Sequence, residues 1–282
     1  MHIFIYILVF SDLKKDKYLT KKDRSTPLDQ AMLFATFDLH RAVENKPFVQ
    51  TMIMKTITRP AYATYLSQLY FIYKAMEEVG EHCQNDPYVK PLYFPTELNR
   101  EKALIEDLVY FYGEKWESKI KCTPATIRYI DRITYLGESN PAMLIPHNFV
   151  RYFGDLSGGQ VLKYKMRKSL KLNEEDKGVQ FYIFENVVDG NKFMQFYTNR
   201  LNALELSNAM YDEMLEEARN AFQLNMDLFE DLEKLYPCIK NKQLEQVKKL
   251  VTVIRHSQKT WTISAILFVL ALITKVYRDV SL

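Results

Sequence analysis

The feature of this sequence that most constrains its fold is a series of helix starts with little between them that could form a sheet. A polar residue precedes a proline at Thr26-Pro27, Thr123-Pro124 and Asn140-Pro141. Such a side chain can accept a hydrogen bond from a free backbone N–H of the first turn, and proline suits the first helical position because its missing N–H has no partner there. We therefore expect a helix to begin at each of these sites.

A long amphipathic segment opens at Ser207 and carries the clearest helical period in the chain. Its inward-facing positions recur every three or four residues, which places them on one face of an α-helix. These positions are Tyr211, Met214, Ala218, Phe222, Asn225, Phe229 and Leu232.

Two further helices can be bounded from their ends, and one segment favours a strand. Thr96 is expected to cap a helix that ends at Gly113, and the run IRYIDRITYLG is expected to end at Gly137. Residues 179–184, VQFYIF, form a strand-like run without an obvious partner. With no internal repeat and no Gly/Ser linker, the sequence predicts a single all-α domain over residues 26–236.

Composition excludes several classes of protein. Hydrophobic residues make up 48% and charged residues 26%, so the chain can bury a sizeable core and is not a disordered protein. A net charge of +3 without a Lys/Arg run does not favour nucleic acid as a partner. The 3 cysteines are scattered and form no CxxC pair, which argues against a disulfide framework or zinc site and favours a reducing compartment.

The C-terminal region predicts a membrane anchor. Residues 261–274 are uncharged and would form a helix of about 21 Å, short of the ~30 Å hydrocarbon core. Extension to Tyr277, with Lys275 reaching toward the headgroups, gives about 26 Å. We expect residues 261–277 to be a transmembrane tail anchor after a polar connector at 237–260, with the main domain facing the cytosol. A buried core helix is the alternative.

The N-terminal region is harder to interpret. MHIFIYILVF is apolar but too short to span a bilayer, lacks a basic start, and precedes the charged run SDLKKDKYLTKKDR. We expect residues 1–25 to be a poorly ordered leader, with a weak signal peptide as the alternative.

The stretch GDLSGGQ, residues 154–160, contains the five letters of the ABC-transporter ATPase signature. An ATPase also needs a GxxxxGK[ST] phosphate loop, and the sequence contains no Gly-Lys dipeptide. The ATPase interpretation is therefore excluded. Each of Gly154, Gly158 and Gly159 costs about 1 kcal/mol relative to alanine inside a helix. Their presence indicates close approach of the backbone to a flat ligand, or a tight helix crossing or kink.

Two pairs of residues spaced one helical turn apart are candidates for a site. Arg151 and Asp155 lie at i and i+4 beside the glycines, among the aromatic residues of NFVRYF. His40 and Glu44 have the same spacing. A carboxylate there can hold the Nδ1–H of the imidazole and leave Nε2 free for a metal, although a simple surface ion pair is the alternative.

Taken together, these segments resemble the heme oxygenase family, in its eukaryotic form with a membrane tail. The resemblance spans about residues 27–236 and rests on DLHRAVEN, YLSQLYFIYKAMEE, LYFPTELNREKALIEDL, TPATIRYIDRI, RYFGDLSGGQVLK and AFQLNMDLFEDL. It implies an all-α fold with heme between a proximal helix and a kinked distal helix. It also implies oxidative opening of heme by dioxygen to biliverdin, carbon monoxide and ferrous iron, with heme as both substrate and cofactor.

The resemblance assigns roles residue by residue. His40 matches the axial ligand of the heme iron and Glu44 its hydrogen-bonding partner. Asp155 matches the carboxylate that organises the distal water. The other matched residues are the distal-helix glycines Gly154, Gly158 and Gly159, the outer network members Arg151, Tyr73 and Asn225, and the aromatic pocket residues Phe222 and Phe229.

This chain departs from the family pattern where the heme propionates bind. The family usually has basic residues at Leu33, Phe37, Met194 and Thr198, and tyrosine at Phe149; Lys192 or Arg200 could substitute. Charge-assisted pairs hold and orient a ligand. We therefore expect weaker heme binding, more than one rotation about the iron–histidine axis, and oxidation less confined to the α-meso carbon.

Two rival interpretations come from other classes: a membrane-tethered heme sensor or buffer with poor turnover, and a helical interaction module that binds no heme. Retention of His40, Gly154 and Asp155 favours the enzyme. No flavin or nicotinamide motif is present, so the resemblance implies electrons from NADPH through a flavoprotein reductase of the endoplasmic reticulum. It also implies location in that membrane and biliverdin reductase as a further partner.

Overall fold

The computed structural model describes residues 24–172 and 176–237, and this part of the chain is helical, with no strand. The all-α prediction is confirmed. The α-helices are α2 (Leu28–Glu44), α3 (Pro47–Ile53), α4 (Arg59–His82), α5 (Pro95–Leu98), α6 (Glu101–Tyr112), α7 (Pro124–Ser139), α8 (Leu144–Asn148), α9 (Gly154–Ser169), α10 (Gly190–Asn202) and α11 (Asn208–Leu235). Short turns of 3₁₀-helix are η2 (Lys90–Leu92), η3 (Trp116–Lys119), η4 (Pro141–Met143) and η6 (Gln180–Tyr182), and η5 (Phe149–Phe153) is a π-helix.

Residues 1–23 of the predicted leader, the predicted connector beyond Pro237 and the predicted tail anchor lie outside the described residues. Arg24, at the end of the predicted leader, is described and pairs with Asp212 at 2.6 Å. Among the helices that the structure does describe, none has the length and apolar character needed to cross a bilayer.

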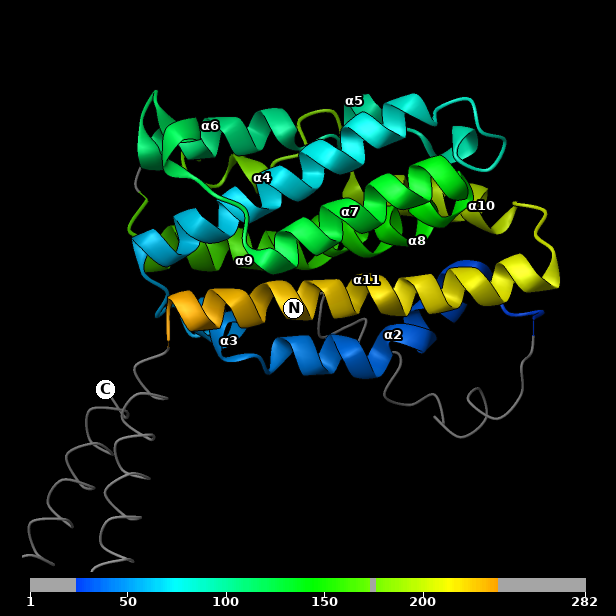
Figure 1. Cartoon of the computed structure of the whole chain (residues 1–282), viewed down its shortest axis with the longest axis horizontal. Helices are drawn as coiled ribbons and strands as arrows, with labels where there is room; N and C mark the ends of the chain where they lie inside the picture. The colour runs from blue at the N-terminus through cyan, green and yellow to red at the C-terminus, as the bar shows by residue number, and fades with distance from the viewer. Residues whose placement is uncertain (1–23, 173–175, 238–282) are drawn as a thin grey trace, which may run out of the picture. The chain divides into compact units, whose positions relative to one another are not determined.

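Helix α4 is the centre of the bundle and packs against both α6 and α7 (Figure 1). Tyr62, Leu66, Leu69, Ile72 and Tyr73 on α4 are all fully buried. A helix that is apolar over most of its circumference belongs in the middle of a helical core. Because α4 carries Tyr73 into that core, it also supplies one side of the site described below.

The close crossing of α4 and α7 depends on Gly137. A Cβ atom at this position would lie 2.3 Å from Cγ1 of Val79, so a larger residue would require the Val79 side chain or the helices to shift. Helix α7 continues to Ser139, which makes the predicted end at Gly137 wrong. Gly137 therefore makes room for the neighbouring helix α4 and does not end α7.

Of the three helix starts predicted from a polar residue before proline, one has the expected threonine cap. The hydroxyl of Thr123 accepts from the backbone N–H of Thr126 at 3.3 Å. Thr58, which the sequence analysis did not single out, caps α4 in the same way. Pro27 precedes α2 and Asn140 precedes η4 without a side-chain cap bond. Prolines at these two starts therefore mark the helix boundary by their fixed backbone geometry alone.

Two segments differ from prediction because a distant carboxylate takes their backbone N–H groups. The helix expected from Thr96 to Gly113 is split into α5 and α6, since Glu77 accepts the N–H of Arg100 at 2.5 Å and of Glu101 at 3.1 Å. The expected strand at 179–184 is instead the turn η6, because Asp107 accepts the N–H groups of Gln180 and Phe181 at 2.8 and 2.9 Å.

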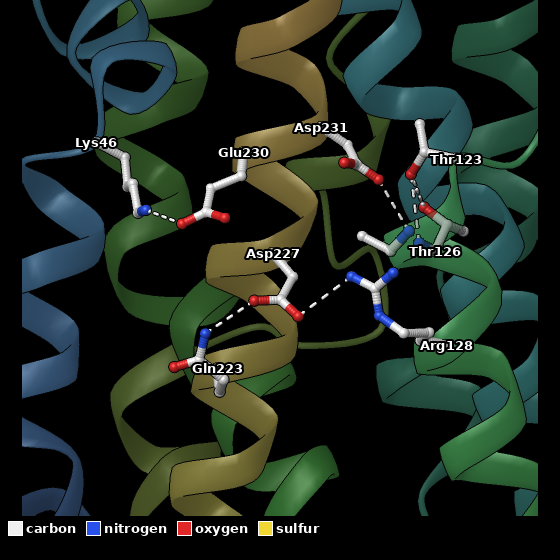
Figure 2. A network of polar contacts seen from close by, with 9 residues as sticks. Lys46, Thr123, Thr126, Arg128, Gln223, Asp227, Glu230 and Asp231 are labelled. Atoms are coloured by element: carbon white, nitrogen blue, oxygen red, sulfur yellow. Dashed lines mark hydrogen bonds and ion pairs between the residues drawn. The ribbon is translucent and has the colours of Figure 1, made fainter.

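Helix α11 buries the face predicted from its period, with Met214, Ala218 and Leu232 fully enclosed. Polar side chains at its C-terminal end tie it to both sides of the bundle (Figure 2). Asp231 accepts the backbone N–H of Ala125 in the first turn of α7 at 2.9 Å. Lys46, just before α3, pairs with Glu230 at 2.5 Å.

Candidate functional site

His40 lies on the last two turns of α2 with a side chain that is 49% exposed. Its Nδ1 atom is 3.7 Å from Oε1 of Glu44, which is too long for a hydrogen bond but close enough for Glu44 to favour a proton on Nδ1. The imidazole ring meets Phe222 of α11 edge to face, with centroids 5.9 Å apart. The arrangement leaves Nε2 as the ring nitrogen that could ligate a metal.

The glycine-rich segment begins α9 directly after the π-helix η5. A π-turn inserts an extra residue into a helix and is frequent at functional sites. Here it carries Arg151 into the protein interior, where the side chain is 8% exposed. This π-helix lies N-terminal to the glycines, and the predicted kink of the distal helix stays a prediction.

The glycines of α9 face different surroundings. A Cβ atom on Gly154 would meet nothing within 4 Å, so this position opens onto free space. A Cβ atom on Gly159 would lie 3.1 Å from Cδ1 of Tyr182. The absence of a side chain at Gly159 is therefore explained by packing against η6, whereas at Gly154 no protein neighbour explains it. Gly158 is half-buried between them.

Asp155 forms the centre of a largely buried polar cluster. The hydroxyl of the fully buried Tyr73, on α4, donates to Oδ2 of Asp155. Burial raises the pKa of Asp155 to about 7, against the opposing effects of the Tyr73 hydrogen bond and of the positive charges of Arg151 and Arg100. A carboxyl with a pKa near neutrality is suited to taking up and releasing a proton at physiological pH.

Arg151 lies between two tyrosine rings, with its guanidinium carbon 5.6 Å from the centroid of Tyr73 and 5.3 Å from that of Tyr129. Its Nε and Nη2 atoms are buried and have no hydrogen-bond partner among the described residues. Asn225 of α11 donates to the carbonyl of Ala221 at 2.9 Å, while its Oδ1 atom is likewise buried and without a partner there. Buried polar groups are normally satisfied, so these atoms indicate a place for water or a ligand.

A second buried chain of polar groups was not found from the sequence. Nδ1 of the fully buried His147 lies 3.3 Å from the hydroxyl of Tyr129, and its Nε2 lies 2.7 Å from Oε1 of Glu217. Arg132 donates from Nε to the same carboxylate at 3.0 Å. His147 stands one turn before Arg151 in the sequence, which is a usable signal, but Glu217 is 70 residues away.

The charges of this chain of groups are set by burial and pairing. Burial lowers the pKa of His147 and so favours the neutral ring. Burial alone would raise the pKa of Glu217, but hydrogen bonds from His147 and Arg132 outweigh it and hold that pKa at about 2. Glu217 is therefore ionised and fixes His147 beside Tyr129, which in turn lines one side of Arg151.

The comparisons with known proteins decide the family. Residues 26–231 match the sequence profile described as heme oxygenase. The chain belongs to the heme oxygenase family. It is 41% identical over 218 residues to heme oxygenase 2 of Rattus norvegicus, covering 77% of this chain and 69% of that protein. It is 40% identical over 208 residues to heme oxygenase 1 of Homo sapiens, covering 74% and 72%.

Solved structures agree with this assignment. A heme oxygenase-2 from Synechocystis sp., in complex with heme and NO, aligns with a TM-score of 0.72 at 35% identity, covering 74% of this chain and 86% of that one. The heme oxygenase of Leptospira interrogans aligns with a TM-score of 0.69 at 35% identity, covering 72% and 98%. The resemblance predicted from the sequence is confirmed.

The residues present fit a heme. A half-exposed imidazole on α2, open space beside Gly154, and the unpaired buried atoms of Arg151 and Asn225 are the features that an iron porphyrin with bound water would use. The two predicted aromatic pocket residues, Phe222 and Phe229, have different neighbours in the structure. Phe222 contacts His40, whereas Phe229 stacks on Phe48 and Tyr65 at 6.1 and 5.9 Å in the core.

The cations that could replace the missing propionate partners are placed unequally. The guanidinium of Arg200 lies over the rings of Phe94 and Phe196 at 5.7 and 4.7 Å and donates to the carbonyl of Pro91 at 3.3 Å. These protein contacts already occupy the Arg200 side chain. Lys192 is 84% exposed and 3.8 Å from Asp189. Arg41 of α2 lies 6.0 Å from the ring of Phe37. Lys192 and Arg41 therefore have fewer described contacts than Arg200.

Proposed function

We propose that this protein is a heme oxygenase that degrades heme with dioxygen and reductase-supplied electrons to biliverdin, carbon monoxide and ferrous iron. The observation that carries the proposal is the presence in one chain of an exposed imidazole, His40, and a half-buried carboxyl, Asp155, whose pKa of about 7 suits proton transfer. Membership of the heme oxygenase family and heme-bound structural relatives support it.

In this proposal each side of the site has a separate task. Bound heme supplies the iron that activates dioxygen and the porphyrin that is oxidised. His40 would hold the iron through Nε2, and Glu44 would keep the proton on Nδ1. Gly154 and Gly158 let the backbone of α9 lie close to the ligand because no side chain intervenes.

Asp155 holds and transfers the proton on the distal side. Tyr73 donates to one carboxylate oxygen and so leaves the other to face water. The unpaired groups of Arg151 and Asn225 hold that water near Asp155, where it can carry protons to the distal face of the ligand. The chain of Tyr129, His147 and Glu217 keeps Arg151 in position.

The entrance of the site bears on the product isomer. Leu33, Phe37, Met194 and Thr198 are half-buried and uncharged, and Phe149 is buried in a stack with Phe153 at 4.7 Å. Without fixed cations for the propionates, these residues would hold heme in more than one orientation. Proton NMR of the low-spin ferric complex should then show more than one set of heme methyl resonances. Chromatography should separate more than one biliverdin isomer; a single set and a pure α product would contradict this.

The finer cellular assignments are also proposals. A catalytic domain over residues 26–236, a connector at 237–260 and an anchor at 261–277 would place the enzyme on the cytosolic face of the endoplasmic reticulum. Electrons would come from an NADPH-dependent flavoprotein reductase in the same membrane, and biliverdin reductase would take the product. The apolar run at 261–274 supports this arrangement.

Titration of the detergent-solubilised full chain with hemin, followed by reductase and NADPH, tests the function. We expect a Soret band to form and then to decay as biliverdin absorbance rises. A stable Soret band without biliverdin would instead identify a heme sensor or buffer. Absence of any Soret band would exclude heme binding altogether.

A further inference from the structure

A surface of lysines and exposed apolar side chains lies where the C-terminal end of α3 meets the C-terminal half of α9, apart from the heme site. We call it the α3–α9 patch; its members are Met54, Lys55, Tyr164, Lys168 and Lys171. Met54 and Tyr164 are 56% and 54% exposed, which places both among the exposed large hydrophobic residues of the described chain. A hollow of about 600 Å³ opens beside Tyr164, Lys168 and Lys171.

The patch is held in a fixed shape by contacts between the two helices. Lys165 donates to the carbonyl of Ile53 at 2.7 Å, and the hydroxyl of Ser169 donates to the carbonyl of Lys55 at 2.9 Å. The Nζ atoms of Lys55 and Lys168 lie 5.6 and 4.7 Å from the centroid of the Tyr164 ring. The Tyr164 ring and the ammonium groups of Lys55 and Lys168 therefore lie together on one surface.

The positive charge of the patch is not neutralised within the part of the chain that the structure describes. Asp176 is the carboxylate beside the hollow, and it pairs with Lys163 at 3.0 Å and Arg167 at 2.5 Å. No ion pair to Lys55, Lys168 or Lys171 occurs among the described residues. Within the described residues, these three lysines therefore have no carboxylate partner.

The residue types distinguish a lipid surface from a protein partner. Lysine is depleted at the centres of protein–protein interfaces, where arginine is preferred. Tyrosine beside lysines is typical of the membrane–water boundary, because the ring sits at headgroup level and the ammonium groups reach the phosphates. Clustered lysines on one surface are also the usual recognition element for anionic phospholipids.

The position of the α3–α9 patch relative to α11 also supports a lipid surface as its partner. Phe48 of α3 stacks on Phe229 of α11 at 6.1 Å. Lys46, just before α3, pairs with Glu230 of α11 (Figure 2). Helix α3 therefore lies beside the C-terminal part of α11 (Figure 1). The uncharged run at 261–274 follows in the sequence. A tether inserted in a bilayer would keep the patch at high effective concentration near lipid, so even a weak surface contact would be populated.

We propose that the α3–α9 patch rests on an anionic bilayer surface, with phospholipid headgroups in the hollow beside Tyr164, and that this contact orients the catalytic domain. Each lysine near such a surface favours binding by about fivefold, so three together contribute roughly a hundredfold. The proposal concerns orientation only and is independent of heme turnover.

The test uses the full chain in vesicles of phosphatidylcholine alone or with about one-third phosphatidylserine. A water-soluble amine-acylating reagent, read by mass spectrometry, reports the access of each lysine, with the 84% exposed Lys192 as internal control. We expect labelling of Lys55, Lys168 and Lys171 to fall at least threefold with phosphatidylserine and to recover at ~0.5 M salt, because salt screens the contact. Equal labelling in both vesicles would overturn the proposal.

A matched pair of variants separates the patch from general charge. Hydrogen exchange of residues 161–172 in phosphatidylserine vesicles should be slowed in the wild type and in the control Lys90→Gln/Lys102→Gln/Lys115→Gln, whose exposed lysines lie elsewhere. The variant Lys55→Gln/Lys168→Gln/Lys171→Gln should lose that protection. Protection that appears only when an acidic soluble protein such as the reductase is added, and never with anionic lipid, would assign the patch to a protein partner instead.

Discussion

The two sides of the heme site are built to different degrees before any heme binds. On the distal side, Asp155 accepts a hydrogen bond from Tyr73, and Arg151 lies between two tyrosine rings. Tyr129 and His147, which adjoin Arg151, are fully buried. On the proximal side, His40 is half exposed and lies 3.7 Å from its only ion-pair partner in the described residues, Glu44.

This difference indicates that the distal side of the site is held more rigidly than the proximal side. Proton transfer requires donors held in place before the reaction, because reorganisation during the reaction would raise the barrier. A metal ligand can be positioned by the metal itself, since the iron–nitrogen bond is stronger than the contacts that it replaces. We therefore expect proximal changes to affect heme binding without affecting the folded protein, and distal changes to affect both.

The largest effect should come from His40→Ala. Loss of the iron ligand should abolish measurable biliverdin formation and change the Soret band, while the free energy of unfolding of the heme-free protein changes by less than about 0.5 kcal/mol, as for other exposed positions. Difference spectroscopy and denaturant unfolding measure the two quantities. His82→Ala, which removes another exposed helical histidine, should leave both unchanged. A destabilised apo-protein would contradict the view of the proximal side as open.

Asp155→Asn should lower biliverdin formation by about 100-fold, the scale of general acid–base catalysis, with iron ligation by His40 intact. It should also alter the pH dependence of stability. The folded-state pKa of Asp155, about 7, exceeds its ordinary value of 3.8, so the stability that the protonated group provides is present below pH 3.8 and is lost as pH rises to about 7.

Thermal unfolding of the two heme-free proteins from pH 5 to pH 8 measures this loss. The midpoint of the wild type should fall relative to that of Asp155→Asn as pH rises. Glu217 does not interfere, because its pKa is lowered to about 2 and its contribution is lost only below its ordinary value of 4.5. Parallel curves over this range would show that Asp155 is ionised in the apo-protein.

The contrast between the two sides also explains what could be predicted from the sequence. His40 with Glu44, and Arg151 with Asp155, are spaced one turn apart on single helices, so local periodicity finds both pairs. Contacts across helices are different. The bond from Tyr73 to Asp155 spans 82 residues, and Tyr73 was assigned through the family resemblance alone.

The same limit accounts for the errors. Glu77 splits the predicted helix at Arg100, and Asp107 turns the predicted strand into η6, in both cases through carboxylates that only the tertiary fold brings near. The chain Tyr129–His147–Glu217 was missed for this reason as well. A polar residue that satisfies a distant backbone or side chain leaves no periodic signal in the sequence.

Alanine substitutions at two glycines of α9, Gly159 and Gly154, should change the stability of the heme-free protein by intermediate amounts and in opposite directions. Gly159→Ala places a methyl group 3.1 Å from the buried Tyr182 ring and should destabilise the heme-free protein by about 1–3 kcal/mol. Gly154→Ala meets no neighbour and should stabilise it by up to about 1 kcal/mol through helix propensity. Chemical denaturation compares the two.

Heme affinity should rank the same two variants in the opposite way. Gly154→Ala fills the open side of α9 and should weaken hemin binding severalfold, whereas Gly159→Ala should bind hemin normally once folded. Tight hemin binding by Gly154→Ala would show that the open space at this residue is not where heme lies.

The smallest effect on the heme-free protein should come from Glu44→Gln. An exposed pair one turn apart contributes only about 0.3–0.5 kcal/mol, and the 3.7 Å separation places this pair at the lower end. With heme bound, Glu44 becomes the group that holds Nδ1–H, so its loss should weaken the donor strength of His40 and lower the iron–histidine stretching frequency in the ferrous complex. Resonance Raman spectroscopy measures that shift, and Glu78→Gln, which removes an exposed carboxylate paired with Lys74 on α4, is the matched control. An unshifted frequency would mean that heme binding does not draw Glu44 onto His40, and the proximal side would then remain loosely held even in the complex.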